Sequence, residues 1–368
     1  MKALILITVH VLFVCQSIFS QSSTNCSIIS LMSGDTVVLG RNHDVTIPNG
    51  LLVFNPRNIH KEGFEFPDED IPRWTSKYSS ITLNVFGVGF AICGMNEKGL
   101  SMGHVGFADA KYPSAKGTPV IDQIHFITYM LDNFTNTHEV VSAVNEISIS
   151  EESITREHYY VCDAIGRTAI LEPIEGEWVI FTNETMPYPI ISNDNYEQSI
   201  DYLKDYQGFG GNRIIPERNF GVEEIMAMGA TYLQDFQNHK NQHVVKSAFE
   251  LLHNIGFNKF PPPEHVDVPQ NYGTHITTVF DLKNLIVYFR TKSYPEIKMV
   301  RFDQFNPDCP DPIMMMEVET DKVGNVSNSF ENFTFEKNLH FVNERLKNDV
   351  PGDIIELLGS YPETFKCK

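Results

Sequence analysis

Hydrophobic and polar residues change their spacing four times along the chain, and each change predicts a change of secondary structure. Short apolar runs separated by turn-forming residues indicate β-strands from residue 26 to 107. Apolar residues three or four apart predict helices from Ile121 to Ile147. Strand-like runs return at 158–194, helical spacing at 196–256 and strands at 274–302. This order favours two antiparallel sheets packed face to face with helices outside, rather than alternating βαβ units.

The first twenty residues differ from the rest of the chain. One early lysine precedes an apolar run from Ala3 to Cys15, and small and polar residues follow. This pattern is typical of a secretory signal peptide and is short for a membrane span. We therefore expect a protein that is secreted or delivered to the lysosomal or endosomal lumen. The predicted parts are a signal peptide at 1–20, a short propeptide at 21–25, a main domain at 26–304 and an extension packed on it at 305–368.

Charge and composition narrow the classes of partner. The formal net charge of -19 argues against nucleic acid and anionic membrane surfaces. No segment after the leader has the roughly 18 to 20 uninterrupted apolar residues of a spanning helix, so no integral membrane segment is expected. Sequons that fit a glycosylating pathway begin at Asn25, Asn133, Asn183, Asn325 and Asn332. The sequence leaves the formation of a homo-oligomer open.

The cysteine count points to one thiol near the start of the predicted domain. One of the six cysteines lies in the predicted leader, so an odd number remains. Cys93 and Cys162 lie in apolar strand-like runs, where buried free thiols are expected. Cys309 and Cys367 lie in polar C-terminal segments and are expected to form a disulfide. Cys26 is then left without an obvious partner.

Common catalytic motifs are absent, and the remaining candidate cluster lies close to Cys26. The sequence has no G-x-S-x-G, H-E-x-x-H, phosphate-binding loop or paired C-x-x-C. Fifteen residues after Cys26 comes "GRNHD", which contains Arg41 and Asp44. A hairpin that turns at residues 33–35 would return both side chains to the thiol. Taken alone, the pair also fits a surface ion pair at a strand end. Histidines in or beside strands are more often structural, and these are His43, His104 and His275.

Three motifs in order resemble the choloylglycine hydrolase family. They are "NCSIISLMSGDTVVLGRNHD", "VFNPRN" and "GMNEKGL", followed in the expected order by "IISND" and the hairpin near 274–290. This family includes bile salt hydrolases and penicillin V acylases and is related to acid ceramidase and N-acylethanolamine acid amidase. The resemblance covers roughly residues 26–302. It implies an α+β fold, the αββα four-layer sandwich of the N-terminal nucleophile hydrolases.

The resemblance also implies catalytic roles for the cluster around Cys26. The cysteine becomes the first residue of the mature chain through autocatalytic processing, and its own α-amine then serves as general base. An α-amine titrates near pH 8 and a thiol near 8.5, so proton exchange between them is well matched at about neutral pH. In such enzymes a carboxylate orients the amine, which is the role implied for Asp44. A cation beside the sulfur favours the thiolate, which is the role implied for Arg41.

Two further parts of the family site are less well defined in this sequence. Asn193 in "IISND" matches an asparagine that is implied to donate a hydrogen bond to the oxyanion. A second family arginine corresponds to Arg218 or to Arg213. The chain departs from the family at Gly106, where bile salt hydrolases carry an asparagine and some penicillin acylases a tyrosine. A glycine offers only its backbone N–H, which puts half of the oxyanion hole in question.

The sequence therefore predicts an amidohydrolase that cleaves linear, non-peptide amide bonds of small N-acyl compounds. The mechanism requires no metal and no organic cofactor. The alternative is a catalytically inactive family member that acts as a secreted lipid-binding or ligand-binding protein. A third interpretation is a disulfide-bearing domain in which Cys26 pairs with Cys309 or Cys367. Bile salt, penicillin, N-acylethanolamine and ceramide substrates are not separated by one sequence.

Overall fold

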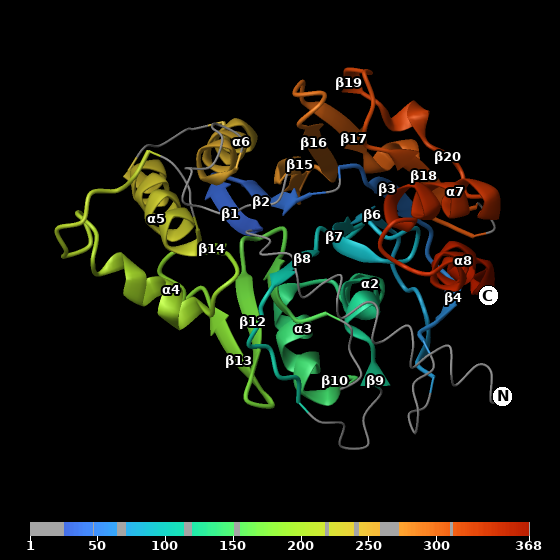
Figure 1. Ribbon diagram of the computed structural model, residues 1–368, viewed down its shortest axis with the longest axis horizontal. Coiled ribbons are helices and arrows are strands. Elements are labelled where there is room, and N and C mark those ends of the chain that lie inside the picture. The colour runs from blue at the N-terminus through green and yellow to red at the C-terminus, as the bar shows by residue number, and fades with distance from the viewer. Residues whose placement is uncertain are drawn as a thin grey trace.

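Two large β-sheets lie at the centre of the computed structural model, with helices on both outer sides (Figure 1). The structure describes residues 26–46, 48–64, 71–113, 120–150, 155–217, 221–238, 243–257, 272–309 and 312–367. The predicted signal peptide and propeptide therefore lie outside the described residues. Within the described ranges, no helix combines the length and the apolar character needed to cross a bilayer.

The first sheet has seven strands and contains the hairpin that the sequence predicts. In spatial order its strands are β14 (Ile190–Ile191), β1 (Ser27–Ser33), β2 (Thr36–Val45), β15 (Gly273–Asp281), β16 (Ile286–Thr291), β17 (Lys298–Arg301) and β19 (Gly324–Asn325). Strands β1 and β2 are antiparallel, and Gly34 adopts a positive φ of 57° in the turn between them. The register pairs Ser27 with Asn42 and Ile28 with Arg41. The predicted hairpin is thus confirmed.

The second sheet has nine strands, and two small sheets accompany it. Its strands in spatial order are β13 (Glu177–Thr182), β12 (Thr168–Ile174), β11 (Glu157–Cys162), β8 (Ser101–Gly106), β7 (Ala91–Asn96), β6 (Ser80–Asn84), β3 (Leu51–Asn55), β18 (Met314–Glu317) and β20 (Glu331–Asn332). The small sheets consist of β21 (Lys366–Cys367), β4 (Ile59–Glu62) and β5 (Arg73–Thr75), and of β10 (Ser148–Ile149) and β9 (Val120–Ile121).

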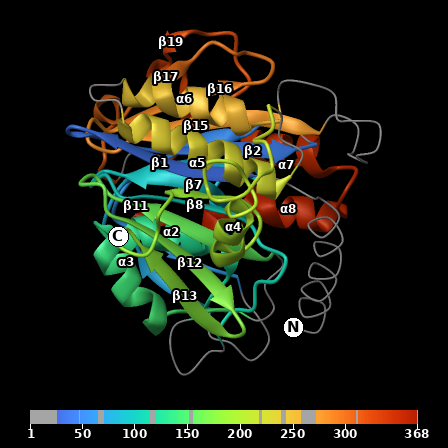
Figure 2. The same ribbon diagram turned by 90° about the vertical axis from the view of Figure 1, so that its left-hand side faces the viewer.

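The helices cover the outer faces of the two large sheets. The α-helices are α2 (Gln123–Asn133), α3 (Thr137–Ala143), α4 (Tyr196–Leu203), α5 (Val222–Asn238), α6 (Val244–Ile255), α7 (Phe335–Leu346) and α8 (Gly352–Ser360). Short 3-10 helices are η1 (Val144–Glu146), η2 (Phe302–Gln304), η3 (Ser327–Ser329) and η4 (Tyr361–Thr364). Helices α5 and α6 pack on the seven-stranded sheet, whereas α2 and α3 pack on the nine-stranded sheet. Figure 2 shows the two pairs on opposite sides of the sheets.

The first strand is buried on both of its faces except beside the turn. Ile28 faces the core between the two sheets, whereas Ile29 and Leu31 face α5 and α6. Cys26 belongs to the core between the sheets, on the same side as Ile28. The hairpin therefore places the candidate nucleophile at one end of the space between the sheets.

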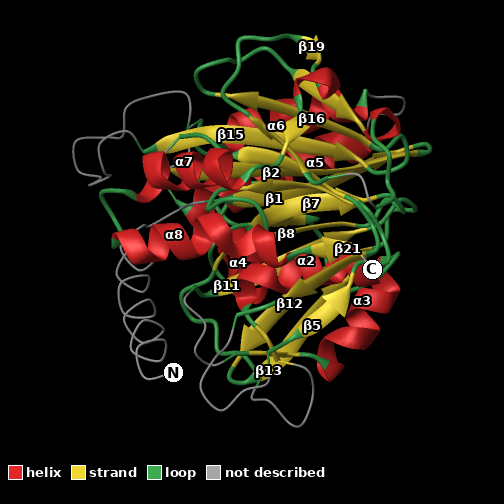
Figure 3. Ribbon diagram, turned by 90° about the vertical axis from the view of Figure 1, so that its right-hand side faces the viewer, coloured by secondary structure: helices red, strands yellow, loops and turns green. Residues whose placement is uncertain are grey.

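The C-terminal segment after residue 304 joins both sheets and covers part of one of them. Strands β18 and β19 extend the nine-stranded and the seven-stranded sheet, respectively. Helices α7 and α8 pack against Leu51 and Val53 on the outer face of β3. Figure 3 shows the two helices beside each other. Cys309 and Cys367 form a disulfide, as the sequence predicts. This bond ties the final strand β21 to the chain just before β18.

Candidate active site

The register of the first hairpin gathers polar groups around the sulfur of Cys26. The thiol is free and only 4% exposed. Nη2 of Arg41 donates to the sulfur at 3.8 Å, and the nearby backbone N–H of Asp44 lowers the pKa of the thiol. Continuing the β1–β2 register by one residue places His43 opposite Cys26, and Nδ1 of His43 lies 4.0 Å from the sulfur. The structure thus brings Cys26, Arg41 and Asp44 together, as the hairpin hypothesis requires.

Arg41 is a buried cation that faces the thiol. Its Nε donates to the carbonyl of His104 at 3.2 Å, which fixes the guanidinium between the sheets. Its Nη1 has no hydrogen-bond partner among the described residues. Burial raises the pKa of the Cys26 thiol to about 11, although the positive charge of Arg41 acts in the opposite direction. In the full-length chain, the thiol is therefore mostly protonated at neutral pH.

Asp44 is a fully buried carboxyl group without a good hydrogen-bond donor. Neither carboxyl oxygen has a partner of normal geometry within the described residues. Burial raises the pKa of Asp44 to about 7, while the nearby hydroxyl of Thr274 and the charge of Arg41 partly oppose this shift. Nearly all buried polar atoms in native proteins are hydrogen-bonded. An unpaired carboxyl at this position therefore marks a place where a donor is missing.

The segment that carries Asn193 lies against Cys26 and against the end of β8. The hydroxyl of Ser192 donates to the carbonyl of Cys26 at 2.9 Å. The side-chain amide of Asn193 donates to the carbonyl of Gly106 at 2.8 Å. The structure therefore brings Asn193 to Gly106, the position where this sequence departs from the family pattern.

The backbone of Gly106 offers a donor in the same direction. Gly106 pairs with Glu157 across β8 and β11, and the next residue, Phe107, donates its N–H to Arg156. Hydrogen-bonded and non-hydrogen-bonded pairs alternate in an antiparallel ladder, so the N–H and C=O of Gly106 both point away from β11. Since its C=O meets Asn193, its N–H points to the same side. The missing side chain at position 106 therefore does not remove the backbone donor.

The structure describes one of the two arginines that the sequence offers as the second active-site arginine. Arg213 forms exposed ion pairs with Glu223 and Glu224 and lies over the ring of Tyr206 at 4.6 Å. These contacts engage its guanidinium on the surface, and the structure does not bring Arg213 to Cys26. Arg218 lies outside the described residues.

Sequence reasoning missed two histidines that the structure places near Cys26. His43 was expected to be structural, yet its ring contacts the sulfur and its Nε2 has no partner in the described part of the chain. Nε2 of His158 donates to the carbonyl of Ser192 at 2.6 Å, and Nδ1 lies 2.8 Å from a carboxyl oxygen of Glu172. This buried pair anchors the segment that carries Asn193. For His43, the two-residue spacing from Arg41 was a usable signal, since both side chains then share one strand face.

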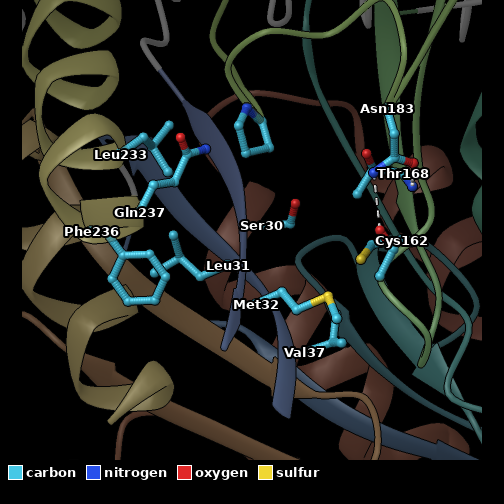
Figure 4. Close-up of a pocket in the computed structure, with 12 residues that line it drawn as sticks. Ser30, Leu31, Met32, Val37, Cys162, Thr168, Asn183, Leu233, Phe236 and Gln237 are labelled. Atoms are coloured by element: carbon cyan, nitrogen blue, oxygen red, sulfur yellow. Dashed lines mark hydrogen bonds between the residues drawn. The ribbon is translucent and has the colours of Figure 1, made fainter. Parts of the chain in front are cut away.

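A cavity of about 180 Å³ lies toward the other end of β1, away from Cys26. Figure 4 shows Cys162 and Thr168 on one side of it and Leu233 and Phe236 of α5 on the other. Its lining consists of Ser30, Leu31, Met32, Val37, Cys162, Gly166, Thr168, Asn183, Pro189, Leu233, Phe236 and Gln237. Cys26 is not part of this lining. In the ranges that the structure covers, no group of three or more His, Cys, Asp or Glu side chains is arranged to hold a metal ion.

Comparisons with known proteins agree with this arrangement. The family model described as linear amide C–N hydrolases, choloylglycine hydrolase family, matches residues 26–315, so the match begins at Cys26. A penicillin V acylase from Pectobacterium atrosepticum is 24% identical over 264 residues, which cover 63% of this chain and 68% of that protein.

Solved structures show the same fold at low sequence identity. Penicillin V acylase from Agrobacterium tumefaciens has a TM-score of 0.70 and 20% identity, covering 84% of this chain and 98% of the other. A variant of conjugated bile acid hydrolase from Clostridium perfringens has a TM-score of 0.66 and 19% identity, covering 81% and 98%. These similarities confirm the N-terminal nucleophile hydrolase fold, with two sheets between helical layers. The chain therefore belongs to the choloylglycine hydrolase family and is an amidohydrolase of linear carbon–nitrogen bonds.

Proposed function

We propose that this protein hydrolyses N-acyl amides with Cys26 as nucleophile, after removal of residues 1–25 exposes its α-amine. The observation that carries the proposal is the buried Asp44 carboxyl, whose two oxygens lack a good donor among the described residues although its charge acts on the thiol of Cys26. A free α-amine on Cys26 carries N–H groups that would donate hydrogen bonds to such a carboxyl. Once paired in this way, the amine is held as a base beside the sulfur.

The proposed reaction follows from the groups around the sulfur. The α-amine takes the proton of the Cys26 thiol as the sulfur attacks the carbonyl carbon of the amide. The side-chain amide of Asn193 and the backbone N–H of Gly106 donate to the developing oxyanion. The amine then returns the proton to the departing nitrogen, which leaves a thioester on Cys26. Water hydrolyses that thioester and restores the thiol.

We further propose that the chain removes its own propeptide. Signal peptidase prefers a small residue before its cut, which Asn25 is not, so a second cleavage is needed to reach Cys26. In that step the sulfur attacks the carbonyl carbon of Asn25, the peptide bond to the nitrogen of Cys26 breaks, and water releases the propeptide. The new α-amine is then in place for the hydrolysis of substrate.

The proposed substrate is a small amphipathic N-acyl compound, and the proposed setting is the secretory route. The similar proteins are named for penicillin V and for conjugated bile acid, both of which join an acyl group to an amine. The setting is supported by the apolar leader and by the disulfide between Cys309 and Cys367, since disulfides persist in oxidising compartments.

Mass spectrometry of the mature N-terminus and activity measurements test the proposal together. We expect the mature chain to begin at Cys26 and to hydrolyse at least one member of an N-acyl amide panel between pH 4 and pH 8. Cys26→Ala should abolish both cleavage and hydrolysis, whereas Cys162→Ala, which changes another buried free thiol, should retain them. A mature chain that begins before Cys26 contradicts the proposal. Substrate binding without turnover by wild-type protein favours the ligand-binding alternative.

A further inference from the structure

The ring of His43 completes a set of polar groups around the nucleophilic sulfur. Nη2 of Arg41 donates to this sulfur, and the nearby backbone N–H of Asp44 lowers the pKa of the thiol. His43 is 6% exposed and lies opposite Cys26 across the hairpin, with Nδ1 at 4.0 Å from the sulfur. Its other ring nitrogen, Nε2, is buried without a partner among the described residues. The ring thus contacts the reacting atom and has no competing hydrogen bond through Nε2.

The surroundings of His43 keep its imidazole neutral. Burial lowers its pKa well below the ordinary value, and nearby positive charge lowers it further. The groups that lower it come from several elements, namely Arg41 of β2, Arg345 of α7, His104 of β8 and His275 of β15. The carboxyl groups that act on the adjacent thiol are Asp44 of β2 and Glu157 of β11. His43 is therefore neutral and carries one ring proton at neutral pH.

The position of that single proton follows from the partners of the two ring nitrogens. A proton on Nε2 would leave a buried N–H without an acceptor, and such orphaned donors are rare in native structures. A proton on Nδ1 points at the sulfur and leaves only an unpaired lone pair on Nε2. The tautomer with the proton on Nδ1 is therefore favoured, and it makes the ring a donor to sulfur.

We propose that His43 is a catalytic residue that donates a hydrogen bond from Nδ1 to the sulfur of Cys26 and stabilises the thiolate. This role rests on the proposed function, in which Cys26 is the nucleophile. The thiol proton passes to the α-amine, and His43 keeps its own proton throughout. Because the ring is neutral, it supports the thiolate without placing a second positive charge beside Arg41. Its contribution also does not titrate away as the pH rises.

Two variants at position 43 separate this role from a structural one. His43→Leu removes the donor at similar volume, whereas His43→Asn keeps an amide N–H close to the position of Nδ1. The probe is the alkylation rate of Cys26 by iodoacetamide between pH 5 and pH 10, followed by mass spectrometry of the Cys26 peptide. A hydrogen bond to a charged group contributes about 1.5 to 3 kcal/mol, so His43→Leu should raise the apparent pKa of the thiol by about one unit or more. Alkylation below that pKa should slow about tenfold, and His43→Asn should stay within about threefold of wild type.

The same experiment defines the results that overturn the proposal. A wild-type pH profile in folded His43→Leu means that the ring does not act on the sulfur. Equal slowing in His43→Leu and His43→Asn indicates that the ring accepts a proton, because an amide nitrogen cannot. If His43→Leu does not fold, His43→Gln carries the same amide one bond farther from the backbone and should show the raised pKa.

The failure of the proposed function remains distinguishable from the failure of this inference. Alkylation of Cys26 is measured without any substrate, and Cys26→Ser gives the background at the same peptide. Wild-type protein that hydrolyses no amide contradicts the proposed function, while a raised thiol pKa in His43→Leu still supports the donor assignment. Active wild-type protein whose thiol titration is unchanged in His43→Leu contradicts the inference alone.

Discussion

Two buried clusters in this protein each contain a cation and a carboxyl group, and they differ in how completely these groups are paired. In the candidate site, Arg41 and Asp44 lie beside Cys26. In the second cluster, Lys61 of β4 and Asp132 of α2 form a fully buried ion pair with N–O distances of 2.8 and 3.2 Å. Trp74 of β5 adds a hydrogen bond from its ring N–H to Asp132 at 2.7 Å. The second cluster thus joins a small sheet to helix α2.

The unpaired atoms lie in only one of the two clusters. Nη1 of Arg41, both carboxyl oxygens of Asp44 and Nε2 of His43 have no good partner in the described part of the chain, whereas every side-chain nitrogen and oxygen of Lys61, Asp132 and Trp74 is paired. Leaving a buried polar group unpaired costs about 1–3 kcal/mol. We interpret the unpaired groups as groups whose missing partner takes part in the reaction. The completely paired groups of the second cluster instead stabilise the fold.

Substitution of the two carboxyl groups should distinguish the roles of the two clusters most strongly. Asp44→Asn should reduce kcat/KM for an N-acyl substrate about 10³-fold, because in the proposed mechanism Asp44 positions the α-amine, and a positioned general base contributes roughly 10²–10⁴. In uncleaved protein, its free energy of unfolding should stay constant or rise, since the Asp44 carboxyl has no good hydrogen bond to lose there. Asp132→Asn is the matched control and should reduce stability while kcat/KM of the folded protein is kept. Equal loss of activity in both variants contradicts the distinction.

The ion pair of the second cluster can be broken directly. Lys61→Met leaves the carboxyl of Asp132 buried without its cation, which should reduce the free energy of unfolding by about 3–5 kcal/mol. Denaturant unfolding measures this loss, and kcat/KM per folded molecule should change less than twofold. Lys61→Met combined with Asp132→Asn should recover part of the stability, because no unpaired charge remains. A loss below about 1 kcal/mol in the single variant would show that the pair is not a structural support.

The pH dependence of stability tests the unpaired carboxyl of Asp44 in protein that has not been cleaved before Cys26. Its pKa is raised from 3.8 to about 7 in the folded chain, so between these values the folded state holds a proton that the unfolded state has lost. Rising pH therefore destabilises the protein through this window, by about 2 kcal/mol between pH 5 and pH 7. The full-length Cys26→Ala protein, which should not cleave itself, is the suitable sample. Adding Asp44→Asn should remove this part of the pH dependence, and identical curves would contradict it.

The sequence was informative where the relevant contacts are local or carry strong residue preferences. The turn at Ser33–Asp35 and the apolar runs beside it predict the hairpin, and the hairpin brings Arg41 and Asp44 back to Cys26. The polar surroundings of Cys309 and Cys367 predict their disulfide. These inferences succeed because strand alternation and turn chemistry follow short-range rules.

Long-range contacts escaped the sequence because no periodicity relates their residues. Lys61 and Asp132 are 71 residues apart and meet only after β4 and α2 are packed. Likewise, the contact between Asn193 and Gly106 joins segments 87 residues apart. Whether the backbone N–H of Gly106 is free to donate depends on which edge of β8 lacks a neighbouring strand at that residue. The identity of residue 106 does not reveal that edge. The candidate at Arg213 illustrates the same problem, since only the fold shows its surface partners.

The smallest expected effect concerns Arg213, the cation that lies outside both clusters. The side chains of Arg213 and its partner Glu223 are nearly half exposed, although Glu224 is mostly buried. Ion pairs in contact with solvent contribute about 0–1 kcal/mol. Arg213→Ala should therefore reduce the free energy of unfolding by less than about 1 kcal/mol and change kcat/KM less than twofold. Arg41→Ala is the matched variant and should reduce kcat/KM at least about 100-fold, because it removes the charge that favours the thiolate. A tenfold or larger loss in Arg213→Ala, with stability unchanged, would instead assign Arg213 to the active site.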